Sequence, residues 1–277
     1  MKKLLLPFLF LAFSLNAQQK ETVDLKWKIS DTLTYNTVMR DLISEDKEEA
    51  ENDSVPHDMS GMLKAMHARF SNLKYETKLF PDKNGNVDIA VMLKKADADS
   101  SETFLSQLAK LNGNVFLRGK VSEEGELLSF YYNRIQSNYI SFLFELPKNP
   151  VKVGDNWKLN VNMISLDPNF KADSLYRKNS VQLKDLKTVN GNKIAVIEYD
   201  LEEFVSGDFE NRMMAMFSKE QAGKKRYMKM SYKAIGEFDI ENGQWILYDG
   251  AMETETNFSP MGISGNKRTE FKLTPDN

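Results

Sequence analysis

Cysteine is absent from the 277-residue sequence. The chain can therefore form no disulfide, supply no thiolate ligand to a zinc ion and carry no lipid-modified cysteine. Its stability has to come from a hydrophobic core, for which a chain of this length is ample. We expect a soluble protein that holds itself together without cross-links or a lipid anchor.

Histidine is almost absent as well. The two histidines, His57 and His67, form no His-Glu-x-x-His arrangement and are weak evidence for a metal site or for general-base catalysis. No glycine-rich phosphate loop occurs, and Gly262-Ile-Ser-Gly265 lacks the spacing of a serine-nucleophile elbow. We predict no catalytic residue, no metal site and no cofactor, and hence a protein that is not an enzyme.

A surplus of one charge is also missing. The 37 Lys and Arg residues nearly balance the 40 Asp and Glu residues, which argues against a nucleic-acid partner. The acidic run over residues 45–53 is typical of a solvated insertion. Two acidic pairs, Glu202 with Glu203 and Glu253 with Glu255, are typical of polar sheet faces, and they leave a hydrolase with a carboxylate site as a third functional class.

Apolar runs long enough to span a membrane are lacking. The apolar stretch over residues 4–13 follows Lys2 and Lys3 and leads to Ala17, which is the pattern of a secretory signal peptide. It is too short to cross a bilayer, which needs about 20 residues. We expect residues 1–17 to be removed, leaving no transmembrane span, and the protein to be exported to the periplasm or secreted.

Alternation of apolar and polar residues is abundant, and it predicts strands with one face in the core. The Asn84-Gly85 turn predicts a hairpin in place of a calcium loop, because both positions favour positive φ. Further hairpins are expected around Gly125, Gly191 and Gly243. The predicted strands cover residues 23–29, 33–39, 73–79, 87–93, 115–121, 127–132, 156–163 and 267–273.

Three segments have the apolar spacing of helices. One covers residues 101–113, one covers residues 135–146 and ends at Pro147, and one lies near residues 208–222. The apolar stripe of the third comprises Phe209, Met213, Met216 and Phe217.

Two stretches of the chain are similar to each other. Lys, Asp, Asn and Met coincide when Lys28–Met39 is aligned with Lys152–Met163, and the hairpin glycines recur in the same order. We predict one body over residues 18–277, built from diverged repeat halves at about 24–146 and 150–275. The expected fold is mainly β: long curved antiparallel sheets forming a sandwich or a partly open barrel, with a few packed helices.

The segment Pro150-Val-Lys-Val-Gly-Asp-Asn-Trp157 resembles a motif of exported protein families of Gram-negative bacteria, which are known only as domains of unknown function. The hairpin from Gly236 to Gly243 fits the same pattern. The resemblance implies a β-rich envelope protein and carries over no catalytic residue.

The preferred hypothesis is a non-enzymatic envelope protein that binds an apolar small molecule or a lipid. Methionine and aromatic side chains on helices are suited to an adaptable apolar site. The expected contact residues are Phe142, Phe144, Met213, Met216 and Phe217. The alternative is a structural or protein-interaction module with a partner in the cell envelope.

Overall fold

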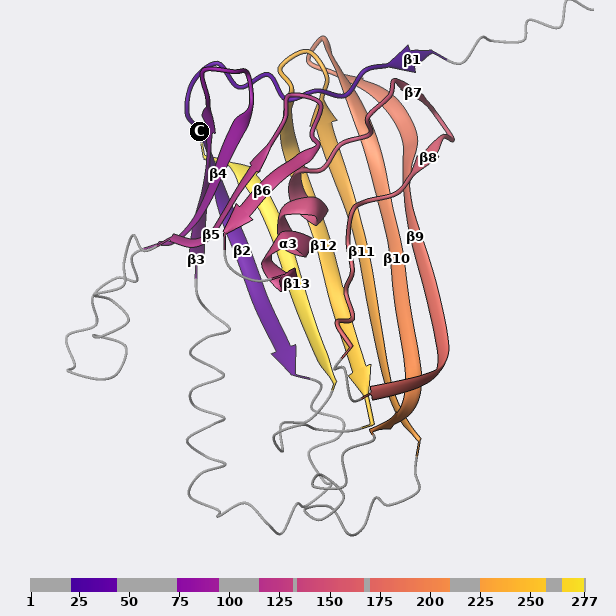
Figure 1. Cartoon of the computed structure of the whole chain (residues 1–277). Coiled ribbons are helices and arrows are strands. Elements are labelled where there is room, and N and C mark those ends of the chain that lie inside the picture. Colours follow the sequence, from indigo (N-terminus) through magenta and orange to yellow (C-terminus); the bar gives the residue numbers. More distant parts are fainter. Residues whose placement is uncertain are drawn as a thin grey trace, which may run out of the picture.

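The protein has a mainly β fold, as predicted (Figure 1). The structure, a computed structural model, describes residues 21–43, 74–94, 115–131, 134–166, 170–209, 225–257 and 266–276. One helix is described, α3 (Arg134–Phe144). The strands are β1 (Thr22–Val23), β2 (Leu33–Ile43), β3 (Lys74–Pro81), β4 (Val87–Leu93), β5 (Val115–Val121), β6 (Leu127–Tyr131), β7 (Val151–Lys152), β8 (Asn156–Trp157), β9 (Phe170–Val189), β10 (Asn192–Phe209), β11 (Arg226–Asp239), β12 (Gln244–Thr256) and β13 (Lys267–Pro275).

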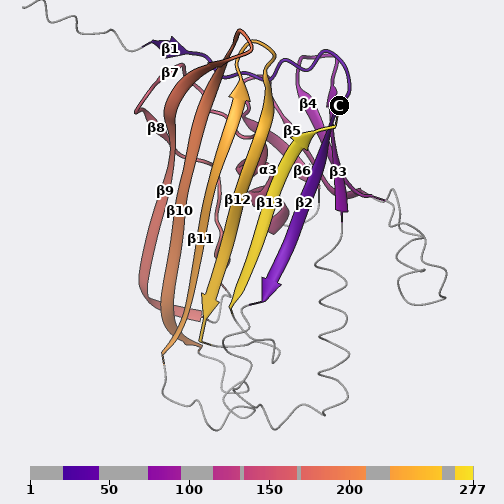
Figure 2. The ribbon, with the colours of Figure 1, turned by 180° about the vertical axis from the view of Figure 1, so that it is seen from behind.

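Eleven of these strands form one antiparallel sheet in the order β6-β5-β4-β3-β2-β13-β12-β11-β10-β9-β8. Two meanders, β2–β6 and β9–β13, join where β2 pairs with β13. The other two strands, β1 and β7, pair with each other as a separate two-stranded sheet. The long antiparallel sheet that the sequence predicts is present as one open sheet of eleven strands. The sheet curls without closing, and β6 and β8 remain its two ends (Figures 1 and 2).

The predicted hairpins are confirmed. The β9–β10 turn has positive φ at both Asn190 (51°) and Gly191 (90°), which matches the twist of the flanking strands. The other three hairpin turns also contain glycines with positive φ, Gly85, Gly125 and Gly243.

Helix α3 confirms the helical pattern over residues 135–146, and it lies within the curve of the sheet (Figure 1). Ile140, Phe142 and Phe144 are at most 2% exposed. A β-carbon at Gly119 of β5 would lie 2.8 Å from Ile140, so the helix packs almost directly on the strand backbone there. The main core therefore lies between α3 and the inner face of the sheet.

Two predicted strands are mostly absent. The predicted strand over residues 23–29 alternates in burial, but only its first residue lies in a strand, β1 (Thr22–Val23). Further along, Trp27 N–H donates to the Glu123 carbonyl and Lys28 N–H to the Gly243 carbonyl, and both carbonyls belong to hairpin turns. Of residues 156–163 only Asn156–Trp157 is a strand. An alternation of apolar and polar residues indicates that one side of a segment is buried. A strand also needs a neighbouring backbone that pairs with it in register.

Of the third predicted helix, near residues 208–222, only residues 208 and 209 lie within the described residues, and both belong to β10. Phe209, assigned to its apolar stripe, is instead the last residue of β10 and pairs with Phe170 of β9. Met213, Met216 and Phe217 lie outside the described residues, as do residues 101–113, the acidic run and both histidines.

Candidate functional site

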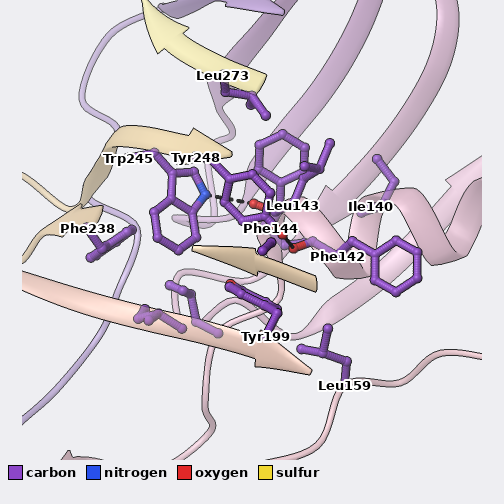
Figure 3. Close-up of a cluster of buried hydrophobic side chains, with 14 of the residues drawn as sticks. Ile140, Phe142, Leu143, Phe144, Leu159, Tyr199, Phe238, Trp245, Tyr248 and Leu273 are labelled. Atoms are coloured by element: carbon purple, nitrogen blue, oxygen red, sulfur yellow. Dashed lines mark hydrogen bonds between the residues drawn. The ribbon is translucent and has the colours of Figure 1, made fainter. Parts of the chain in front are cut away.

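The C-terminal end of α3 is held by aromatic side chains from the sheet and from the N-terminal segment. The last four carbonyls of a helix have no partner within the helix. Here the Ser141 carbonyl accepts from Glu145 N–H at 3.2 Å. The Phe142 carbonyl accepts from Tyr248 Oη (2.8 Å) and the Leu143 carbonyl from Trp245 Nε1 (2.7 Å), and these two bonds are drawn in Figure 3. The Phe144 carbonyl accepts from Trp27 Nε1 (2.9 Å). Every carbonyl of the last turn is thus satisfied inside the core.

Phe142 and Phe144, two of the predicted contact residues, belong to this packed end. Phe142 stacks on Tyr232 with ring centroids 4.1 Å apart, and Phe144 lies 5.8 Å from the Trp27 ring. Phe144 is fully buried. Its position is that of a core residue, whereas Phe142 also borders a cavity.

That cavity, here the methionine cavity, has a volume of about 20 Å³. It is lined by Asn138, Tyr139, Phe142, Met163, Met230 and Met252. Met252 is paired with Tyr232 across β11–β12, and Met230 lies two residues from Tyr232 on the same strand face. These three methionines were not among the predicted contact residues, because their grouping depends on strand register and on the segment that carries Met163.

Residues 158–166, here the strap, lie between α3 and the edge of the sheet. Side chains replace a neighbouring strand as hydrogen-bond partners of its backbone. The Asn138 amide bonds both Asn162 N–H (3.0 Å) and the Asn162 carbonyl (2.8 Å), and the Asn179 amide does the same for Leu159. This explains why the predicted strand over residues 156–163 ends at Trp157.

Two buried carboxyl groups also hold the strap. Glu203, 4% exposed, accepts from Ile164 N–H at 2.9 Å and lies 3.8 Å from the Arg177 guanidinium. Both oxygens of Glu145 accept from Asn160 N–H, at 2.9 and 3.0 Å. Burial nevertheless raises the pKa of Glu145 above its usual value of 4.5. These carboxyl groups serve as backbone acceptors.

A second and larger hollow, here the groove, has a volume of about 410 Å³ and lies beyond the end of α3. It is lined by Glu145, Leu146, Pro147, Lys148, Asn149, Val151, Asp155, Asn156, Trp157 and Lys158. Most of these residues belong to the Pro150–Trp157 motif or adjoin it. Motif residues that the sequence indicates as turn and core positions therefore line the larger of these two hollows.

The three tryptophans have different environments. Trp27 and Trp245 are at most 1% exposed, and each indole N–H donates to a helix carbonyl. Trp157 is partly exposed, and its buried Nε1 has no hydrogen-bond partner among the described residues. An unsatisfied buried donor is rare in folded proteins and calls for an explanation.

The acidic pairs show no paired-carboxylate geometry. Glu202 and Glu203 lie on opposite faces of β10, and Glu202 pairs with Lys229 at 3.0 Å. Glu253 and Glu255 share an exposed face, where they bond Arg268 and Tyr227. Within the described ranges, no group of three or more His, Cys, Asp or Glu residues could hold a metal ion. No described helix has both the length and the apolar character needed to span a membrane.

Comparisons with known proteins give no family. No protein-family model matches the chain, and no curated protein matches it either. The resemblance at residues 150–157 stays a prediction, as does the relation between the two repeat halves.

Proposed function

We propose that this protein is an exported, non-enzymatic carrier that binds an apolar small molecule or a lipid chain on the inner face of its curved sheet. The observation that carries the proposal is the methionine cavity beside α3. Its three methionines come from the strap, β11 and β12, so one spot on the inner face collects flexible apolar side chains from three segments.

The chemistry of methionine supports this role. The unbranched thioether side chain has several rotatable bonds and adapts to ligands of irregular shape. A volume of about 20 Å³ holds no more than a water molecule. Binding of an acyl chain would therefore proceed by displacement of the methionine side chains, with Tyr139 and Phe142 as aromatic walls.

The inner face also continues past the cavity. Leu201 and Val205 of β10 are at most 2% exposed, and the buried Glu203 lies between them on the same face. The paired strand β11 adds Met228 and Met230 to this face. The apolar side chains on these adjacent strands suit an elongated ligand. A longer apolar chain buries more surface, and each Å² buried contributes roughly 25 cal/mol to binding.

The first experiment is native mass spectrometry of protein purified from the cell envelope, combined with displacement of the dye 1-anilinonaphthalene-8-sulfonate by oleate. We expect a co-purifying apolar mass and a displaceable dye. A clean unliganded mass with no displaceable dye would overturn the carrier proposal. N-terminal sequencing of the same sample is expected to begin at Gln18, and an intact Met1 would contradict the proposed export.

A matched set of variants places the site. The double variant Met230→Gln with Met252→Gln puts two amides at the cavity, and we expect it to weaken oleate binding about tenfold. Met92→Gln makes a single change of the same type on β4, away from the cavity, and should leave the affinity within about twofold. Equal losses in both would place the ligand elsewhere.

A second candidate, a protein-interaction module, is favoured by the edge of β9. Within the described residues, the outer edge of this long strand pairs with β8 only at Val181 and Gln182. Leu175 and Tyr176 on it are 55% and 49% exposed. Edges of this kind can add a strand from a partner. A stable partner in cross-linking pulldowns, together with a clean unliganded mass, would favour this function over the carrier.

A further inference from the structure

We propose that the groove at the end of α3 is a saccharide-binding site, in which a sugar ring packs against Trp157 and its hydroxyl groups bond the surrounding side chains. The groove shares no lining residue with the methionine cavity. This inference is therefore independent of the proposed carrier function.

The size of the groove is that of a small-ligand site. Its volume of about 410 Å³ falls within the range of roughly 300–1,000 Å³ typical of such sites. Its wall comes from two short segments, residues 145–149 and 151–158. Strands β7 and β8 bound the turn at residues 153–155, and β7 pairs with β1 while β8 pairs with β9, so the turn is held at both ends.

The charges in the groove favour a neutral ligand. Lys148 and Lys158 supply two cations, and Glu145 and Asp155 supply two carboxyl groups. Lys148 is already bonded to Glu126 at 2.5 Å, and one oxygen of Asp155 accepts from Lys152 N–H at 2.9 Å. A phosphate or sulfate group would meet both carboxyl groups at close range, where like charges repel.

The polar groups suit a ligand that both donates and accepts hydrogen bonds. Asn149 contributes a side-chain amide with donor and acceptor atoms. The Asn156 amide also lines the groove, where it donates to the Gly154 carbonyl and accepts from Ser180 Oγ. The ammonium groups only donate, and an ionised carboxylate only accepts. Hydroxyl groups match such a mixture because each is both a donor and an acceptor, and a sugar ring carries several at fixed angles.

Trp157 supplies the apolar surface that a sugar ring needs. The C–H faces of a pyranose ring are apolar, and an indole is the largest aromatic surface available to cover one. No hydrogen bond among the described residues holds the indole N–H of Trp157, unlike those of Trp27 and Trp245. The N–H of this indole can therefore gain an acceptor from a sugar hydroxyl without giving up an existing hydrogen bond.

The experiment is a printed glycan array probed with the purified full chain, followed by isothermal titration with the best glycan in free form. Tryptophan fluorescence is recorded in the same titration. We expect at least one glycan to bind and to change the fluorescence, since Trp157 is the partly exposed tryptophan. Binding of the free glycan supports a saccharide site, and retention of that affinity when the glycan is lipid-linked in phosphatidylcholine vesicles would identify a glycolipid as an additional source.

Variants separate the groove from the rest of the surface. Trp157→Ala is expected to weaken binding of that glycan at least about tenfold, because the ring contact is lost. Tyr176→Ala removes an exposed aromatic ring of β9 outside the groove and should leave the affinity within about twofold. Should Trp157→Ala fail to fold, Asn149→Ala tests the exposed rim and is expected to weaken binding about threefold. The proposal is overturned if no glycan binds above the blank, or if the groove variants bind as well as Tyr176→Ala.

Discussion

The two flanks of the C-terminal end of α3 use the same residue types in opposite ways. On one flank, Trp27, Trp245 and Tyr248 are buried and donate to three consecutive helix carbonyls. On the other flank, Trp157 borders the open groove and its N–H has no partner among the described residues. The first arrangement stabilises the fold, while the second places a partly exposed aromatic ring and an N–H without a partner at the groove.

The difference teaches that hydrogen bonding together with exposure, more than residue type, distinguishes Trp157 from Trp27 and Trp245. A buried donor without a partner costs free energy, and proteins keep such costs chiefly where they serve a purpose. Mutations on the two flanks should therefore have very different effects on stability.

The largest effect is expected for Trp245→Phe. The change removes a buried donor, leaves the Leu143 carbonyl unpaired and creates a void beside Phe238, whose ring lies 5.0 Å away. We expect a loss of about 3 kcal/mol in the free energy of unfolding, measured by urea denaturation. A loss below about 1 kcal/mol would break the distinction between the flanks.

The strap should be the next most sensitive region. Asn138→Ala removes the side-chain amide that bonds both backbone groups of Asn162. Leaving these groups unpaired is expected to cost about 2 kcal/mol in the free energy of unfolding. Hydrogen exchange at residues 159–164 is expected to accelerate selectively, and uniform acceleration across the sheet would show that the strap is not a separate unit.

A substitution at Tyr199 is expected to stabilise the protein. Its hydroxyl is fully buried without a hydrogen-bond partner among the described residues, close to Tyr232 and Tyr248, and burial raises its pKa well above the usual value. Tyr199→Phe removes the unsatisfied group and keeps the ring, so we expect a gain of about 1 kcal/mol, read as a higher melting temperature. A lower melting temperature would mean that the hydroxyl has a partner.

Glu145 should make stability depend on pH. Because burial raises the pKa of its carboxyl in the folded state, the folded protein holds this proton more tightly than the unfolded chain does. This contribution is complete below the usual carboxyl pKa and is lost as pH rises through the raised value. We expect the stability difference between Glu145→Gln and the wild type to grow in favour of the variant as pH rises from 4 to 7. Parallel pH profiles in urea denaturation would contradict the burial effect.

The smallest effect on stability is expected for Trp157→Phe. No hydrogen bond among the described residues is lost and the ring is partly exposed, so the free energy of unfolding should change by less than about 1 kcal/mol. A circular-dichroism melt run beside Trp245→Phe checks this contrast directly. A loss equal to that of Trp245→Phe would make Trp157 a core residue and remove the basis of the groove assignment.

Much of the fold could be predicted locally. The Asn-Gly and glycine turns, the alternation in β2 to β4 and the apolar pattern of α3 each depend on residues close in sequence. The strand predictions were wrong where the backbone of a segment finds its hydrogen-bond partners in other parts of the chain. Residues 24–29 and 158–163 have strand-like patterns, but their backbone groups bond turns and side chains far away in the chain.

The candidate sites divide in the same way. Phe142 could be picked out as an aromatic on a helix, but its neighbours Met163, Met230 and Met252 are assembled by register and by the strap. The groove was visible in the sequence only as a turn motif.

The sequence by itself determined the mainly β character, the hairpin turns and the position of α3, because these follow from periodicity and from the backbone freedom of glycine. The tertiary structure alone decided which tryptophan indoles are hydrogen-bonded and which one has no hydrogen-bond partner among the described residues. That outcome depends on whether a carbonyl lies within reach of each indole, and the carbonyls of Leu143 and Phe144 lie more than a hundred residues from their donors.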